Sequence, residues 1–285
     1  MSDTGKDVLL GALLWVLFTA AVSAHTDLGD RIDVLTHQIQ HQPKSASLFL
    51  QRGRLFYLRG HYQDAFDDFQ KAKKLQANPL EVSYLQGLAL LKLGRLDAAL
   101  SAFNQVLGQN PSNSMALMNR ARVFRAKKEF APAASDYRRA LDLMPSPQPD
   151  DFLEVADNYI ESSEQSVRLA LSVLDAAITK LGMLVQLQAR AIEIEMMTKH
   201  YSAALRRVDA LLATLRHKAK WLVKKSEILL TMGKPCQAKR NFRLALASIA
   251  KLPAARRNVP AIQKLDIKIR AALNDPAQCQ SEAQP

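Results

Sequence analysis

Small and aromatic residues recur at intervals of 34 along the first half of the chain. Gly53, Gly87 and Ala121 form one series with this spacing. Three further series share the interval: Gly60, Gly94 and Lys128; Ala65, Ala99 and Ala133; and Phe69, Phe103 and Tyr137. Self-similarity at a period of about 34 is typical of repeat proteins. The pattern predicts three consecutive units, 46–79, 80–113 and 114–147.

Each series has a physical role in a pair of packed helices. The small residue at position 8 of a unit allows a close approach to the second helix, where the alanine at position 20 is the matching contact. The aromatic residue at position 24 fills the space between the two helices. A glycine at position 15 adopts the left-handed conformation that ends the first helix, and a proline near position 32 ends the second.

This spacing resembles the tetratricopeptide repeat, a helical hairpin of about 34 residues. The resemblance covers residues 46–147, and the first unit matches it at Phe49, Gly53, Phe56, Gly60, Tyr62, Ala65, Phe69 and Ala72. It implies an all-α fold, a right-handed superhelical solenoid of such hairpins. Residues 148–253 resemble about three degenerate units, because 150–183 lacks the glycine turn. The stretch 146–151, which contains proline and serine, is the expected hinge, although a continuous solenoid is equally allowed.

Both ends of the repeat array are predicted to be capping helices. Residues 25–45 contain a lone helix over 30–41. Residues 254–285 contain a helix over 258–273 and a tail. The apolar side of this last helix is expected to hold Val259, Ile262, Leu265, Ile267 and Ile269. A terminal helix with a polar outer face keeps the end of a solenoid soluble.

Residues 1–24 have the pattern of a secretory signal peptide. A short polar segment precedes an apolar run over 8–24, which ends in Val22-Ser23-Ala24 with small residues at the cleavage position. Cleavage near Ala24 predicts a periplasmic or secreted protein. The alternative is an uncleaved membrane anchor, although a run of about 17 residues is at the short limit for spanning a bilayer.

Composition and charge narrow the possible functions. The chain is 48% hydrophobic but only 6% aromatic, which suits close helix packing better than sheets. Its formal net charge of +12 favours anionic partners, and export makes nucleic acid the least suitable of these. The sequence contains no phosphate-binding, metalloprotease or nucleophile-elbow motif. We therefore expect no enzymatic activity, no small-molecule substrate and no cofactor.

Cysteine and histidine suggest two further hypotheses. Cys236 is expected at the start of the second helix of the last unit, which should pack antiparallel to the terminal helix. Cys279 lies just past the end of the terminal helix, so the chain would return toward Cys236 there. A disulfide is expected in an oxidising compartment; the alternative is two unrelated thiols. His25 would be the mature N-terminus after cleavage, and His37 and His41 lie four residues apart on one helix face. These histidines are either ligands for copper or nickel or ordinary solvated side chains.

The resemblance also implies a binding surface. In tetratricopeptide arrays the first helices of the units line a concave groove, which binds an extended segment or a helix of a partner. The groove positions implied here are Arg54, Tyr57, Tyr84, Leu88, Leu91, Met118, Asn119, Arg122 and Arg125. Arginine binds carboxylates through paired hydrogen bonds, and methionine offers adaptable apolar contact. The surface therefore suits a partly acidic, amphipathic segment.

Three functions remain open at this point. The first is a non-enzymatic protein-binding scaffold outside the cytoplasm, which the repeats favour. The second is a metal-handling protein that uses the N-terminal histidines. The third is an electrostatic binder of envelope polymers or of an anionic membrane surface.

Overall fold

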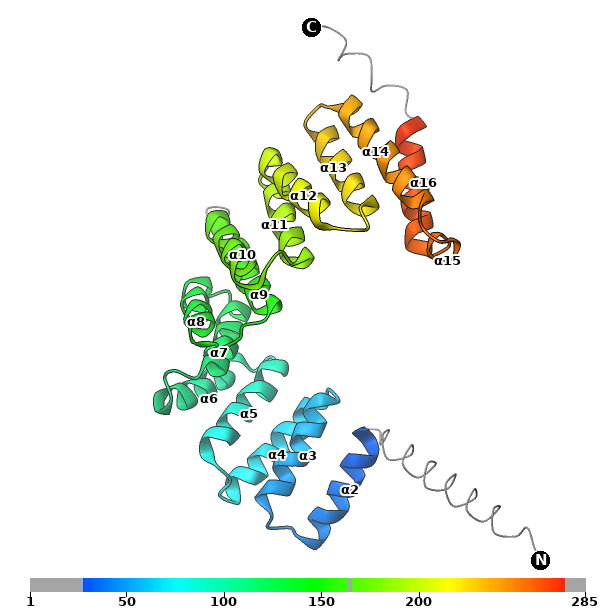
Figure 1. The fold of residues 1–285 in the computed structure, drawn as a ribbon. Coiled ribbons are helices and arrows are strands. Elements are labelled where there is room, and N and C mark those ends of the chain that lie inside the picture. Colours follow the sequence, from blue (N-terminus) through cyan, green and yellow to red (C-terminus); the bar gives the residue numbers. More distant parts are fainter. Residues whose placement is uncertain (1–27, 164–165, 275–285) are drawn as a thin grey trace, which may run out of the picture. The chain divides into compact units, whose positions relative to one another are not determined.

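The computed structural model describes residues 28–163 and 166–274, and every regular element in these ranges is a helix (Figure 1). The chain divides into two compact units, residues 1–145 and 146–285. The all-α fold class, built from helical hairpins, is therefore confirmed. None of the described helices combines the length and the hydropathy needed to cross a bilayer.

The first unit consists of one helix followed by three hairpins. The single helix is α2 (Leu28–His41). The hairpins are α3 (Ala46–Leu58) with α4 (Tyr62–Lys74), α5 (Pro79–Lys92) with α6 (Leu96–Gln109), and α7 (Ser114–Ala126) with α8 (Phe130–Leu143). Each helix packs against its neighbours along the chain, and α5 also contacts both α3 and α7. The first helices of the three hairpins therefore lie side by side (Figure 1).

Two glycines allow the helices of a hairpin to approach closely. A Cβ atom at Gly53 would lie 2.6 Å from Cε1 of Phe69, and one at Gly87 would lie 2.7 Å from Cε1 of Phe103. Phe69 and Phe103 are 1% and 0% exposed. The close approach predicted at position 8 and the aromatic residue predicted to fill the space between the helices at position 24 are therefore present in both hairpins.

The turn inside each hairpin uses the left-handed region of backbone conformation. Gly60 and Gly94 have φ angles of 85° and 71°, which glycine adopts without a steric penalty. In the third hairpin Lys128 occupies the same position with a φ of 61°. This conformation costs a residue with a side chain about 1–2 kcal/mol. The hairpin thus keeps its turn geometry where the sequence has lost the glycine.

Two partly buried ion pairs brace the first and third hairpins. Arg52 binds both carboxylate oxygens of Asp68 at 2.8 Å, and Arg120 binds Asp136 in the same way at 2.6 and 2.9 Å. Each arginine also donates a hydrogen bond to a side chain on the helix that precedes its hairpin. Each pair therefore joins three helices, and the two pairs occupy equivalent positions two repeats apart.

The second unit also consists of three hairpins and a terminal helical segment. The hairpins are α9 (Pro149–Ser162) with α10 (Val167–Leu181), α11 (Val185–Met197) with α12 (Tyr201–Thr214), and α13 (Ala219–Thr231) with α14 (Pro235–Ala250). The short helix α15 (Ala254–Arg257) and α16 (Pro260–Asn274) follow. Arg207 of α12 links the first two hairpins, because it binds Asp175 of α10 and Glu195 of α11, both at 2.8 Å.

The terminal helix α16 covers α14 with only part of its expected apolar side. Ile269 is fully buried, and Ile262 and Leu265 pack beside it. Val259 and Ile267, in contrast, are 45% and 68% exposed, so their assignment to the apolar side was wrong. Val259 precedes the helix. Ile267 points away from α14, because two residues correspond to about 200° of rotation around an α-helix.

Candidate functional site

Three of the residues expected in the groove lie on the first helices of successive hairpins in the first unit. Tyr57 lies on α3, Tyr84 on α5 and Arg122 on α7. Burial is the largest cause that raises the pKa of Tyr57; the phenols of Tyr62 and Tyr84 raise it further, whereas the charge of Arg122 lowers it. Hydrogen bonds through Asn119 of α7 bring Tyr84 and Arg122 close together.

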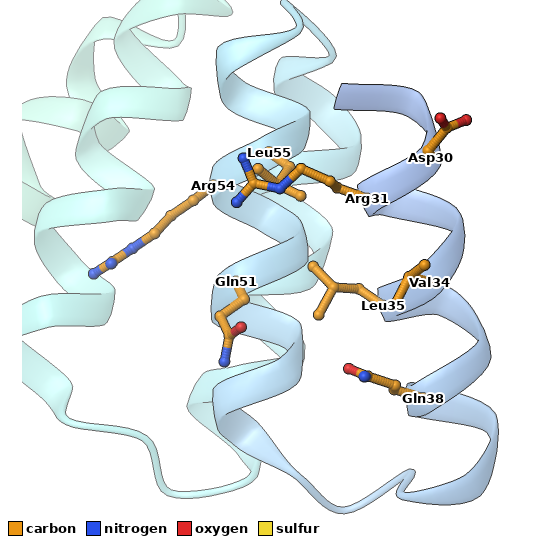
Figure 2. Close-up of a pocket in the computed structure, with 8 residues that line it drawn as sticks. All are labelled: Asp30, Arg31, Val34, Leu35, Gln38, Gln51, Arg54 and Leu55. Atoms are coloured by element: carbon orange, nitrogen blue, oxygen red, sulfur yellow. The ribbon is translucent and has the colours of Figure 1, made fainter. Parts of the chain in front are cut away.

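A hollow of about 490 Å³ lies between α2 and α3 (Figure 2). It is lined by Asp30, Arg31, Val34, Leu35, Gln38, Gln51, Arg54 and Leu55. Leu35 and Leu55 are buried and form an apolar base. Figure 2 shows Gln38 and Gln51 on opposite walls and Arg31 extending from α2 toward α3. The hollow thus combines an apolar base with polar and charged groups at its edges.

A second hollow, of about 220 Å³, lies between α3 and α5. Its lining is Arg54, Tyr57, Leu58, Phe69, Leu85 and Leu88. Leu58 is 68% exposed, although it is a large apolar side chain. Arg54 lines both hollows, so α3 separates two adjoining depressions. We call their combined surface the α2–α3–α5 face.

The two arginines of this face differ in their partners. Arg54 forms an ion pair with Glu81 of α5, and both side chains are exposed. Its charge is therefore partly neutralised within the chain. Arg31 makes no ion pair with any residue in the described ranges. Arg31 is consequently the better of the two candidates for binding a carboxylate of a partner, although the repeat pattern pointed to Arg54 and not to Arg31.

Asn119 acts within the protein rather than at its surface. It is 2% exposed, and its Nδ2 donates to the hydroxyl of Tyr84 at 3.1 Å and to the carbonyl of Met115 at 2.8 Å. Arg122 donates to Oδ1 of Asn119 at 2.9 Å. Burial is the main cause that raises the pKa of Tyr84, while Arg122 and the hydrogen bond from Asn119 lower it. Asn119 therefore fixes Tyr84 and Arg122 in place.

The remaining expected groove residues have different degrees of exposure. Met118 is 1% exposed, so its assignment to the groove surface was wrong; its flexible apolar side chain fills the core instead. Leu88 and Leu91 are half-buried and pack on the cluster around Phe103. Arg125 is half-buried on α7.

The residues of α2 that line the hollow between α2 and α3 were not predicted from the sequence. Arg31, Val34 and Gln38 lie outside the repeated segment, so the period of 34 carries no information about them. Their spacing of three and four residues places them on one face of a helix. Since Val34 is 57% exposed, that face is available to a partner. Helical periodicity applied to residues 28–41 was therefore the signal that could have found them.

A hollow of about 300 Å³ in the second unit lies between α11, α13 and α16. Trp221 is 6% exposed on its lining, and Nζ of Lys220 lies 5.8 Å from the centroid of a Trp221 ring. Glu227 binds Lys268 at 2.6 Å and also faces Lys224 at 3.8 Å. Most charges of this hollow are thus balanced internally, which makes it a weaker candidate than the α2–α3–α5 face.

The expected metal ligands and the expected disulfide lie only partly within the described ranges. His37 and His41 are exposed on α2, whereas His25 lies outside those ranges. Within them, no group of three or more histidine, cysteine, aspartate or glutamate residues is placed to hold a metal ion. Cys236 is half-buried on α14, and Cys279 lies outside the described residues. The disulfide therefore stays a prediction.

Comparisons with known proteins agree with the repeat. Residues 84–147 match the family model of the tetratricopeptide repeat. Human tetratricopeptide repeat protein 13 is 35% identical over 83 residues, which are 29% of this chain and 9% of that protein. Two solved structures share the fold at low identity. The C-terminal part of a repeat protein from Cytophaga hutchinsonii is 15% identical, with a TM-score of 0.63 over 80% of this chain and 93% of that one. A repeat protein from Parabacteroides merdae is 16% identical, with a TM-score of 0.53 over 87% and 93%.

Proposed function

We propose that this protein, a member of the tetratricopeptide repeat family, is a non-enzymatic scaffold that binds a segment of another protein on its α2–α3–α5 face. Tetratricopeptide repeat proteins bind protein partners. One observation carries the proposal for this face: two hollows adjoin across α3, and Arg54 lines both. Two adjoining depressions of this kind fit an elongated ligand better than a compact one.

The lining of the face favours an amphipathic segment with at least one carboxylate. The hollow between α3 and α5 is almost entirely apolar, and Leu58 at its edge loses exposed surface when it is covered. Arg31 at the edge of the other hollow supplies a charge that no described residue pairs. A partner that places an apolar side chain against Leu58 and a carboxylate near Arg31 would cover the apolar surface and pair the charge.

The proposal also places the protein outside the cytoplasm. It rests on the sequence of residues 1–24, which lie outside the described ranges. Intact-mass measurement of the protein from the cells that make it provides the test. A chain that begins at His25 supports export with cleavage, and a full-length chain in the cytosolic fraction opposes it.

Site-specific photo-crosslinking tests the binding face. A benzophenone amino acid at position 58 lies at the proposed face, whereas the same group at position 143 on α8 lies on a comparably apolar, 42% exposed site that lines neither hollow. We expect position 58 to capture a defined partner segment that position 143 does not. Equal capture at both positions would refute the face.

Two further variants identify the chemistry of the contact. Val34→Asp places a charge on the exposed wall of the first hollow and should abolish the crosslink from position 58 without loss of helicity. Arg31→Glu should weaken binding of an acidic partner at least about tenfold, because an attractive charge pair becomes a repulsive one. If position 58 captures envelope polymer or lipid instead, and this capture falls steeply as the salt concentration rises, the result would favour the hypothesis of an electrostatic binder of envelope polymer or membrane.

A further inference from the structure

Two histidine rings converge on the exposed side of α2. His37 and His41 are one helical turn apart, and their Nε2 atoms are separated by 3.4 Å. The ring centroids are 4.6 Å apart and the ring planes are inclined by 61°. Because residues four apart on a helix are neighbours on its surface, the convergence follows from the spacing of the two residues.

The separation matches that of two ligands on one metal ion. A tetrahedral ion at about 2.05 Å from each of two imidazole nitrogens holds those nitrogens roughly 3.3–3.4 Å apart. As a hydrogen bond between the rings, 3.4 Å is longer than the roughly 2.7–3.2 Å typical of such bonds. We propose that His37 and His41 form a two-histidine chelate for a late transition-metal dication such as Zn²⁺, with water in the remaining coordination positions.

The position of the pair on α2 supports a bound cation. His41 lies in the last turn of the helix, where unpaired carbonyl groups create partial negative charge. The packing of α2 does not depend on either histidine. Its contact with α3 uses Ile32 and Leu35, which are buried, whereas both histidines are exposed. The pair is therefore available for binding and for substitution.

The site is open, and it is independent of the proposed binding face. Within residues 28–163 and 166–274 no third protein ligand joins the pair. We therefore expect reversible binding of one ion, not a structural metal on which folding depends. Nickel and copper follow the same ligand chemistry, but Zn²⁺ avoids the redox reactions that copper brings to a chain with two cysteines.

Calorimetric titration of the full chain with Zn²⁺ tests the proposal. The matched control is the double variant His37→Gln, Gln40→His, which keeps the number of histidines but places them at positions 40 and 41. Adjacent helical residues do not face each other, so one ion cannot bind both rings. The single variant His41→Gln removes one ligand.

We expect the unmodified chain to bind one Zn²⁺ at least about tenfold more tightly than either variant, because the second imidazole binds intramolecularly. Circular dichroism checks that all three chains are equally helical. Equal affinity in the unmodified chain and the shifted control would overturn the proposal and assign binding to other side chains. A variant that unfolds would be replaced by His37→Asn, which removes the other ligand.

Discussion

The close approach of α5 and α6 makes an unusual prediction for Gly87. Alanine in place of glycine within a helix normally stabilises a protein by about 0.4–1 kcal/mol, because it restricts the unfolded chain. At Gly87 the added Cβ would lie 2.7, 2.8 and 3.0 Å from three ring atoms of Phe103, whereas ordinary contacts of a Cβ are 3.4–4 Å. The ring of Phe103 is fully buried, so it can move only if the side chains around it shift as well.

The magnitude follows from two opposing effects. Overpacking of a well-packed core costs about 1–3 kcal/mol. Subtracting the gain of about 0.4–1 kcal/mol in the unfolded chain leaves Gly87→Ala destabilising by about 1.3 kcal/mol at the midpoint of both ranges, and by at most about 2.6 kcal/mol. Gly108 of α6 is the matched control, because a Cβ there meets nothing within 4 Å. Gly108→Ala should therefore stabilise the protein by about 0.4–1 kcal/mol.

Urea denaturation followed by circular dichroism at 222 nm measures both changes as free energies of unfolding. A double-mutant cycle with Phe103→Leu identifies the cause. If the clash is with the ring, Gly87→Ala should cost at least about 1 kcal/mol less in the Phe103→Leu background. A clash with the ring is refuted if Gly87→Ala stabilises the chain as much as Gly108→Ala does, or if its cost is unchanged in the Phe103→Leu background.

Two further pairs of substitutions test the repeat architecture by the same measurement. Lys128→Gly should stabilise the protein by about 1 kcal/mol, because Lys128 adopts the left-handed conformation that glycine holds at Gly94. Gly94→Lys should destabilise it by a similar amount. An unchanged free energy of unfolding in either variant would contradict this. Asp136→Ala should destabilise the protein by about 3 kcal/mol, because the substitution leaves the partly buried charge of Arg120 unpaired. Asp142 is exposed on the same helix, so Asp142→Ala should change the free energy of unfolding by less than about 0.5 kcal/mol.

Much of the local architecture could be predicted from the sequence. The repeat predicted a close approach of the two helices at Gly87 and an aromatic residue, Phe103, in the space between them, and the structure contains both features. The position of Lys128 in the glycine series predicted a turn there, although lysine rarely adopts that conformation. Both features depend on residues within one hairpin, and the repeat shows each of them several times.

The details of the candidate site were less predictable. The pattern placed Met118 and Asn119 on the groove, but both are buried, because a repeat position specifies a helix face only approximately. It also predicted that Arg54 binds a partner, whereas Arg54 already forms an ion pair with Glu81. The wall formed by α2 was missed, since no repeat includes that helix.

The sequence by itself determined that the chain forms helical hairpins, where they turn and which small residues let them close, because these properties arise within about 34 residues and are repeated. Only the tertiary structure decided which side chains of neighbouring hairpins meet. Asn119 bonds to Tyr84 from 35 residues away, and Glu81 reaches Arg54 from 27. Such partners depend on how one hairpin stacks on the next, and that stacking is set by the combined packing of many side chains, which no short motif encodes.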